Sequence, residues 1–203
     1  MKFAPQIVRA QDVAPRPWRN GGGQTRELFT WPADSTPAAA PPAATPWQLR
    51  ISLAEVSSSG PFSAYPGVQR WFTVVDGAGV RLTLDGVKHH LDAGSAPLHF
   101  AGEAAVHCEP VAGPTRDLNL MCSGGTALVL PCRSHACWTS PLTQRGLFTR
   151  CAGRWHIAGG LAMELPAHTL LWLIDAAGLD FFFEAPSRNH RGPAGWWLGY
   201  TPG

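Results

Sequence analysis

The sequence predicts an all-β protein made of short strands that tight turns connect. Only 15% of its 203 residues are charged, while glycine (22) and proline (19) are plentiful. This composition favours short strands over long helices. Residues 47–56 (WQLRISLAEV) alternate polar and apolar side chains with the period of two typical of a half-buried strand. Asp-Gly turn signals follow, and no segment predicts an amphipathic helix of more than two turns, so an all-β barrel is the expected class.

Strand-like segments recur along the chain. A first short strand is expected within residues 7–15, a second at 24–31, and two or three within 68–91, with tight turns at 76–79 and 84–87. Further strands are expected at 96–102, 104–111, 116–122 and 126–130, and a second group within 147–174. Residues 140–147 predict either a helical turn or a loop. Residues 32–46, rich in alanine and proline, predict an exposed loop.

Charge and hydropathy exclude several classes of partner. The formal net charge is only +2, and lysine occurs only at Lys2 and Lys88, so no basic stripe predicts a nucleic-acid partner. No apolar run reaches the 18–20 residues of a membrane span, and no signal-peptide core follows the N-terminus. Five scattered cysteines fit reduced thiols better than a disulfide framework. We therefore expect a cytoplasmic protein that contacts neither nucleic acid nor membrane.

Polar side chains two residues apart share one face of a strand, and such pairs recur here. Charged residues are scarce, yet they concentrate in these strands. The candidate residues are Trp18, Asn20, Thr25, Glu27, Arg50, Ser52, Arg70, Asp117 and Asn119. One interpretation is that they line a single cavity inside a barrel, where most charges would be paired and an arginine could grip a ligand carboxylate. The other is that they form the solvated faces of half-exposed strands.

The glycine run at residues 21–23 lies between two of these pairs. Neither of the glycine-rich phosphate-binding patterns is present, and no helix is expected to follow. The run therefore predicts a backbone bend that brings Trp18 and Asn20 together with Thr25 and Glu27 at one barrel mouth.

Three blocks resemble a known family. The first, WRNGGGQTREL, resembles the Trp-Arg/Lys-Asn-Gly-x-Gly-x-Thr-x-Glu signature of the HutD/Ves family. The second, WQLRISLAEVSSSGPFSAYPGVQR, is similar to its Arg-x-Ser, Gly-x-Phe-Ser and Pro-Gly-x-x-Arg block, and GPTRDLNLMC resembles its third block. The resemblance spans residues 18–121.

The resemblance implies a bacterial, cytoplasmic bicupin, two fused β-barrels of the RmlC-like kind in one compact domain of residues 1–203. The first barrel would span about 15–130 and the second about 131–203 with the N-terminal strand. The family's polar positions, carried over, are the nine candidate residues above. They would bind a small molecule in the first barrel, and one branch of the family is associated with histidine utilisation.

No metal or other cofactor is expected. Metal-dependent cupins hold their ion with His-x-His, a glutamate and a later histidine, whereas this chain has Trp71, Phe72 and Thr73 where the first ligands would fall. His89 and His90 would point to opposite faces of a strand, and His99 and His107 could meet only across a hairpin. Residues 132–137 (CRSHAC) match no common zinc-binding spacing.

The leading hypothesis is a metal-independent binding protein for an anionic amino-acid derivative, accessory or regulatory in histidine catabolism. Arg50 and Arg70 would contact a carboxylate. The alternative is a cupin enzyme, an isomerase or hydrolase, with Glu27 as general base. Trp196 and Trp197 predict either cover for a barrel end or a homodimer contact.

Overall fold

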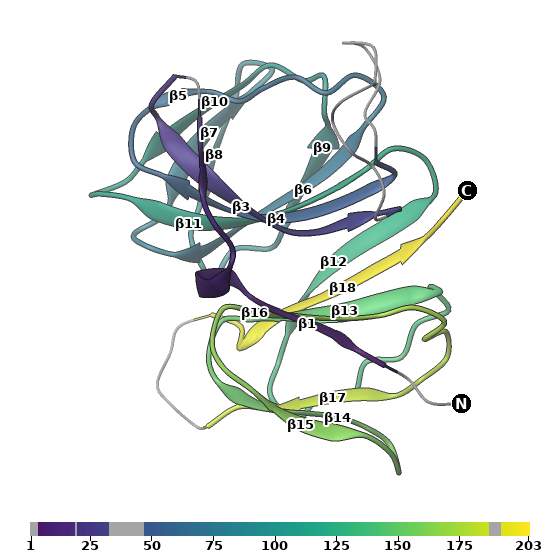
Figure 1. Ribbon diagram of the computed structural model, residues 1–203. Helices are drawn as coiled ribbons and strands as arrows, with labels where there is room; N and C mark the ends of the chain where they lie inside the picture. Colours follow the sequence, from purple (N-terminus) through teal and green to yellow (C-terminus); the bar gives the residue numbers. More distant parts are fainter. Residues whose placement is uncertain (1–3, 19, 33–46, 187–191) are drawn as a thin grey trace. The chain divides into compact units, whose positions relative to one another are not determined.

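The computed structural model describes residues 4–18, 20–32, 47–186 and 192–203. Within them the architecture is all-β, with eighteen strands and one short 3₁₀ helix, Ala10–Asp12. The chain divides into two compact units, residues 14–125 and residues 1–13 with 126–203, which are described separately (Figure 1). None of the described helices is long and apolar enough to cross a membrane. The predicted loop at 32–46 lies outside the described residues except for Pro32.

The unit of residues 14–125 contains two antiparallel sheets. The larger has the strand order β2-β3-β4-β11-β6-β9 and the smaller β5-β10-β7-β8. The strands of the larger sheet are β2 (Arg16–Pro17), β3 (Gly23–Trp31), β4 (Leu49–Val56), β6 (Gln69–Asp76), β9 (Leu98–Ala101) and β11 (Thr115–Cys122). Those of the smaller are β5 (Gly60–Pro61), β7 (Val80–Leu84), β8 (Val87–Leu91) and β10 (Val106–Pro110). Figure 1 shows these strands curving around a common centre.

The two Asp-Gly turns of this unit have different roles. Asp85-Gly86 closes the β7–β8 hairpin, in which Leu84 is paired with Val87, as the sequence predicts. Asp76-Gly77 instead carries the chain from β6 to β7, which belong to different sheets. Gly77 has a φ of 98° there, and a Cβ at this glycine would lie 2.7 Å from the Pro114 carbonyl oxygen. The Asp-Gly dipeptide therefore provides a sharp turn. Whether the two flanking strands pair with each other depends on the tertiary fold.

The interior of this unit changes from polar to apolar along the strands. On β4, Arg50, Ser52 and Ala54 line a pocket, whereas Val56, two residues farther along the same face, joins an apolar cluster. On β6, Arg70 lines the pocket, and Phe72, two residues farther along the same face, belongs to the apolar cluster. The cluster's buried members are Val56, Phe72, Val74, Val80, Leu82, Leu91, Phe100, Val106 and Cys108. The apolar end supplies the core, so polar side chains can gather at the other end.

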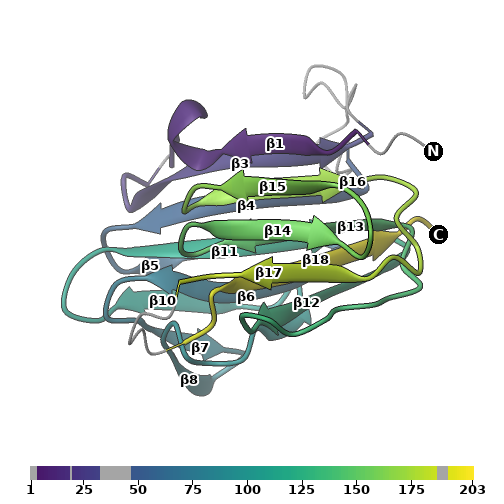
Figure 2. The same ribbon diagram turned by 90° about the horizontal axis from the view of Figure 1, so that it is seen from below.

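The second unit also has two antiparallel sheets. Their orders are β1-β16-β13-β18-β12 and β15-β14-β17. The strands of the larger sheet are β1 (Gln6–Arg9), β12 (Thr126–Cys132), β13 (Gln144–Thr149), β16 (Thr169–Leu173) and β18 (Gly195–Thr201). Those of the smaller are β14 (Gly153–Ile157), β15 (Ala162–Leu165) and β17 (Phe181–Glu184), which run side by side in Figure 2. The predicted helical turn at 140–147 is wrong for its second half, because β13 begins at Gln144.

Large aromatic side chains fill the second unit. Trp155, Phe181 and Phe183 are each 0% exposed and belong to one buried cluster. Trp197 belongs to it too and stacks on Trp138 with ring centroids 5.3 Å apart. Trp196 and Trp197 are both buried in this unit, which favours the alternative of cover for a barrel end, and a homodimer stays a prediction. Bulky apolar groups make up most of the core of this unit.

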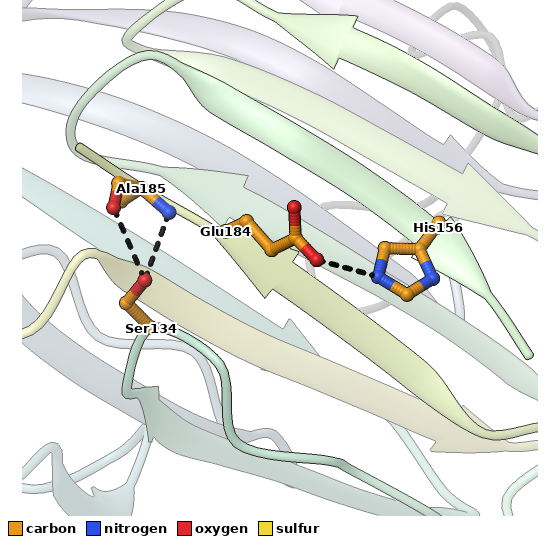
Figure 3. Close-up of polar contacts among 4 residues, drawn as sticks. All are labelled: Ser134, His156, Glu184 and Ala185. Atoms are coloured by element: carbon orange, nitrogen blue, oxygen red, sulfur yellow. Dashed lines mark hydrogen bonds and ion pairs between the residues drawn. The ribbon is translucent and has the colours of Figure 1, made fainter.

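The small sheet of the second unit carries polar contacts at its surface. Figure 3 shows the Glu184 carboxylate of β17 pointing toward His156 of β14, with Oε1 3.2 Å from Nε2. His156 also stacks on Phe182, with ring centroids 4.9 Å apart. At the end of β17, Ser134 Oγ accepts a hydrogen bond from the Ala185 amide at 2.9 Å and donates to its carbonyl. These contacts join neighbouring segments of the unit.

Candidate ligand-binding site

A pocket of about 520 Å³ opens at the polar end of the 14–125 unit. Its volume lies in the range of small-molecule sites. The described residues that line it are Arg16, Pro17, Trp18, Asn20, Thr25, Arg50, Ser52, Ala54, Pro61, Phe62, Ser63, Tyr65, Arg70, Asn119 and Met121. The lining combines arginines, neutral hydrogen-bonding groups and aromatic rings, a mixture suited to an anion with an apolar part.

The glycine segment forms one wall of the pocket. Gly21 has a φ of 70°, in the left-handed region, and its amide donates to the Trp18 carbonyl at 3.0 Å. Asn20 Oδ1 accepts from the Gly22 amide at 3.0 Å. A Cβ on Gly23 would lie 2.3 Å from the Glu55 carbonyl oxygen and 3.1 Å from the Trp18 ring. The glycines therefore permit a tight turn against β4. The segment that follows them is strand β3, whereas a phosphate site of the helix N-terminus type requires a helix there.

This turn places Trp18 beside Thr25. The indole Nε1 of Trp18 donates to Thr25 Oγ1 at 2.7 Å. β2 pairs with β3, with Arg16 opposite Thr25, so the two sides of the turn lie against each other. Trp18, Asn20 and Thr25 all line the pocket, in agreement with the bend that the glycine run predicts.

Glu27 and Arg50 form an ion pair at the pocket edge. Arg50 Nε donates to Glu27 Oε2 at 3.0 Å, and the two side chains are 18% and 28% exposed. A β-bulge after Glu27 keeps it opposite Ser52 while Phe29 is opposite Ile51. Arg50 lines the pocket, but Glu27 does not. The carboxylate therefore holds the arginine from outside the cavity.

Arg70 is the most buried cation of the site. Only 9% of it is exposed, and its Nε and Nη2 both donate to Asn119 Oδ1, at 3.0 and 2.7 Å. Its guanidinium lies 4.3 Å from the Phe62 ring centroid. Burial lowers the pKa of Arg70 to about 10, so it stays charged at neutral pH. Within the described chain, no carboxylate forms a salt bridge with it, and its partners are a neutral amide and aromatic faces.

Asp117 lies one step deeper on the same face of β11 as Asn119. It is 0% exposed, and Thr115 Oγ1 donates to its Oδ2 at 2.8 Å. No group in the described residues hydrogen-bonds to its Oδ1. Burial raises the pKa of Asp117 to about 7, against the lowering effects of the Thr115 hydroxyl and the Arg70 charge. Asp117 does not line the pocket.

Seven of the nine candidate residues therefore line one pocket, and Glu27 and Asp117 stand behind it. Whether any of them binds a ligand stays a prediction. The sequence reasoning missed several lining residues, chiefly Arg16, Phe62, Ser63, Tyr65 and Met121. Met121 continues the alternation of Asp117 and Asn119, so it could have been found. Arg16 lies two residues before Trp18 and continues its spacing with Asn20, so it could also have been found. Ser63 and Tyr65 lie in a loop, where spacing does not indicate the direction of a side chain.

The donor set of the pocket does not fit a cupin metal centre. Such a centre needs imidazole, thiolate or carboxylate ligands, and none of the described lining residues supplies one. The described residues contain no group of three His, Cys, Asp or Glu side chains that could hold an ion. His99 and His107 cannot meet across a hairpin, because β9 and β10 lie in different sheets.

The family model of HutD matches residues 10–188. The chain belongs to the HutD family. An uncharacterized 21.2 kDa protein from the hutC 3′ region of Pseudomonas putida is 36% identical over 116 residues, 57% of each chain. The match thus spans little more than half of that relative's length. Protein Ves of Cronobacter sakazakii is 30% identical over 175 residues, 82% of this chain and 91% of that protein.

Two similar solved structures share the fold over nearly the whole chain. HutD from Pseudomonas fluorescens SBW25, in its formate condition, has a TM-score of 0.77 and 28% identity, with 98% of each chain covered. A conserved protein of unknown function from Pseudomonas aeruginosa PAO1 has a TM-score of 0.79 and 27% identity, with 98% and 99% covered. The predicted family and the all-β, cupin-type fold are confirmed.

Proposed function

We propose that this chain binds a small anionic amino-acid derivative in the pocket of its 14–125 unit, without a metal ion. The observation that carries the proposal is Arg70, a buried cation that lines the pocket and has a neutral amide as its hydrogen-bond partner. A buried charge is costly unless an opposite charge compensates it. A ligand carboxylate would supply that charge and could accept the Arg70 donors that Asn119 leaves free.

The other lining groups define the rest of the ligand. Arg50 is held by Glu27 and can contact a second polar or anionic group near the pocket edge. Trp18, Phe62 and Tyr65 offer flat apolar surface to a short carbon chain or a planar ring. Asn20, Thr25, Ser52 and Asn119 supply neutral donors and acceptors. Amino-acid breakdown products combine these features in one small molecule.

The proposed role is accessory or regulatory, in the cytoplasm, in amino-acid catabolism and in particular histidine breakdown. Membership of the HutD family and the hutC-region origin of the Pseudomonas putida relative support that context. All five cysteines are free thiols, as expected in a reducing compartment. The alternative, a cupin enzyme with Glu27 as general base, gains no support from the geometry, because Arg50 engages Glu27 and the carboxylate lies off the pocket lining.

Thermal unfolding at pH 7 with a panel of small molecules tests the proposal. The panel contains histidine, urocanate and acetate, with histidinamide, urocanamide and acetamide as their counterparts without a carboxylate. A carboxylate at 100 times its Kd should stabilise the protein by about 2.7 kcal/mol. Arg70→Met should abolish that shift and Arg50→Ala should reduce it, whereas Arg81→Ala, an exposed arginine of β7, should leave it unchanged.

Two results would overturn the proposal. One is a panel in which no carboxylate stabilises the protein more than its amide counterpart. The other is an equal response from wild type, Arg70→Met and Arg50→Ala.

A further inference from the structure

Asp117 is a buried carboxyl group that the proposed binding role does not use. Its Cα partners are Ala54 of β4, which lines the pocket, and Val74 of β6, which belongs to the apolar cluster. The side chain therefore lies between the pocket floor and the core. It has one hydrogen bond, from Thr115, and its Oδ1 has no partner among the described residues. A fully buried carboxylate in such surroundings is costly, whereas the protonated form carries no charge.

Asn119 connects this carboxyl to the cation of the pocket. Its Oδ1 accepts both hydrogen bonds of Arg70, and its Nδ2 donates to the Asp117 backbone carbonyl at 3.4 Å. Arg70 is close enough to lower the pKa of Asp117, and Asp117 raises that of Arg70. The same guanidinium thus acts on the buried carboxylate below it and on any anion in the pocket above it.

We infer that Asp117 couples a proton to anion binding at Arg70, so that the pocket binds carboxylates tightly when Asp117 is protonated and weakly when it is ionised. This inference rests on the proposed function. An ionised Asp117 offsets part of the positive charge of Arg70 and repels an incoming anion. A bound anion in turn offsets the positive charge with which Arg70 stabilises the Asp117 carboxylate. The pKa of Asp117 therefore rises, and binding of the anion favours uptake of one proton.

The groups around Asp117 leave it as the titrating group near neutral pH. From β6 it faces Arg70, which is charged below a pKa of about 10. From β10 it faces Cys108, whose pKa burial raises to about 12, so that it stays a neutral thiol. Arg50 of β4 also acts on Arg70 and forms an ion pair with Glu27. No histidine is among the described residues that line the pocket.

The test measures acetate affinity between pH 5.5 and 8.5, a range in which acetate itself stays ionised. Backbone amide shifts of Arg70 and Asn119 follow the binding. For wild type, the affinity should fall roughly tenfold between pH 6 and 8.5. Asp117→Asn should keep the high affinity at every pH. Thr115→Val should move the fall to higher pH, because it removes the hydroxyl that lowers the pKa of Asp117.

Glu103→Gln is the matched control, since it removes an exposed carboxylate of the same unit and should leave the wild-type profile unchanged. If Asp117→Asn fails to fold, the proton coupling is tested by the pH at which acetate affinity falls in Thr115→Val. Identical pH profiles in wild type, Asp117→Asn and Thr115→Val would overturn the proton coupling while leaving anion binding intact. Absence of acetate binding at any pH would overturn it as well, and the carboxylate panel then shows separately whether the proposed function also fails.

Discussion

Each unit of this protein buries an arginine against aromatic rings, and the two arginines use their donors differently. Arg145 of β13 is 0% exposed, with its guanidinium 4.2 Å from the ring centroids of both Trp138 and Phe181. Its terminal nitrogens donate to the backbone carbonyls of Trp138, Ala176 and Leu179. Arg70 has Asn119 as its hydrogen-bond partner and lines a pocket.

The comparison shows that a buried arginine is not by itself a sign of a binding site. Arg145 ties together segments around residues 138 and 176–179, and its charge meets carbonyl dipoles and ring faces. Arg70 donates only to Asn119 among the described side chains, and a pocket lies beside it. Arg145 Nε also has no hydrogen-bond partner among the described residues, so the feature that separates the two arginines is the open pocket beside Arg70.

The largest expected effect is on stability, through Arg145. Arg145→Met keeps the apolar stem but removes the guanidinium donors from three backbone carbonyls, so the free energy of unfolding should fall by about 4 kcal/mol. Arg70→Met removes a charge that lacks a carboxylate partner and should change it by about 1 kcal/mol or less. Urea denaturation measures both. Equal losses in the two variants would mean that the arginines have the same structural role.

The next effect concerns Asp117 and depends on pH. Its folded-state pKa of about 7 lies above the unfolded value of about 3.9, so the wild type loses stability as pH rises between these values. Asp117→Asn, which cannot ionise, should therefore be about 4 kcal/mol more stable than wild type at pH 8, and the difference should nearly vanish at pH 4. Urea unfolding at both pH values measures it. A difference that is the same at pH 4 and pH 8 would contradict the prediction.

A smaller effect is expected at matched glycines. A Cβ on Gly23 would lie 2.3 Å from the Glu55 carbonyl oxygen, and one on Gly146 of β13 would lie 2.2 Å from that of Leu171. Each change to alanine should cost about 2 kcal/mol through overpacking. Only Gly23→Ala also displaces Trp18, so it alone should weaken acetate binding. A loss of binding in Gly146→Ala would show that the two units are coupled.

Much of the fold could be predicted because it depends on local pattern. Alternation in residues 47–56 and the Asp85-Gly86 turn indicate strands and a hairpin directly. The Asp76-Gly77 turn shows the limit of such signals: it has the same dipeptide, but it connects two different sheets. The residues of a turn determine how sharply the chain bends. The packing of distant strands determines which strand the chain pairs with after the turn.

Within the site, alternation identified the polar residues that share a strand face, but not which of them line the pocket and which lie behind it. Thr25, Arg50, Ser52, Arg70 and Asn119 line the pocket as that pattern indicates. Glu27 has the same spacing from Thr25, yet it pairs with Arg50 outside the lining, and Asp117 is sealed below Asn119. Alternation tells which face a side chain occupies, and depth along that face depends on where the neighbouring strands end.

The sequence by itself determined the all-β class, the family, the turn at the glycines and the sets of polar residues that share a strand face, because each depends on spacing within local segments of the chain. Only the tertiary structure decided which of those residues share a cavity, that Arg70 has a neutral amide in place of a carboxylate, and that Asp117 lies out of reach of solvent. Those properties depend on distances between β4, β6 and β11, which the strands acquire only when the sheet forms and excludes water from between them.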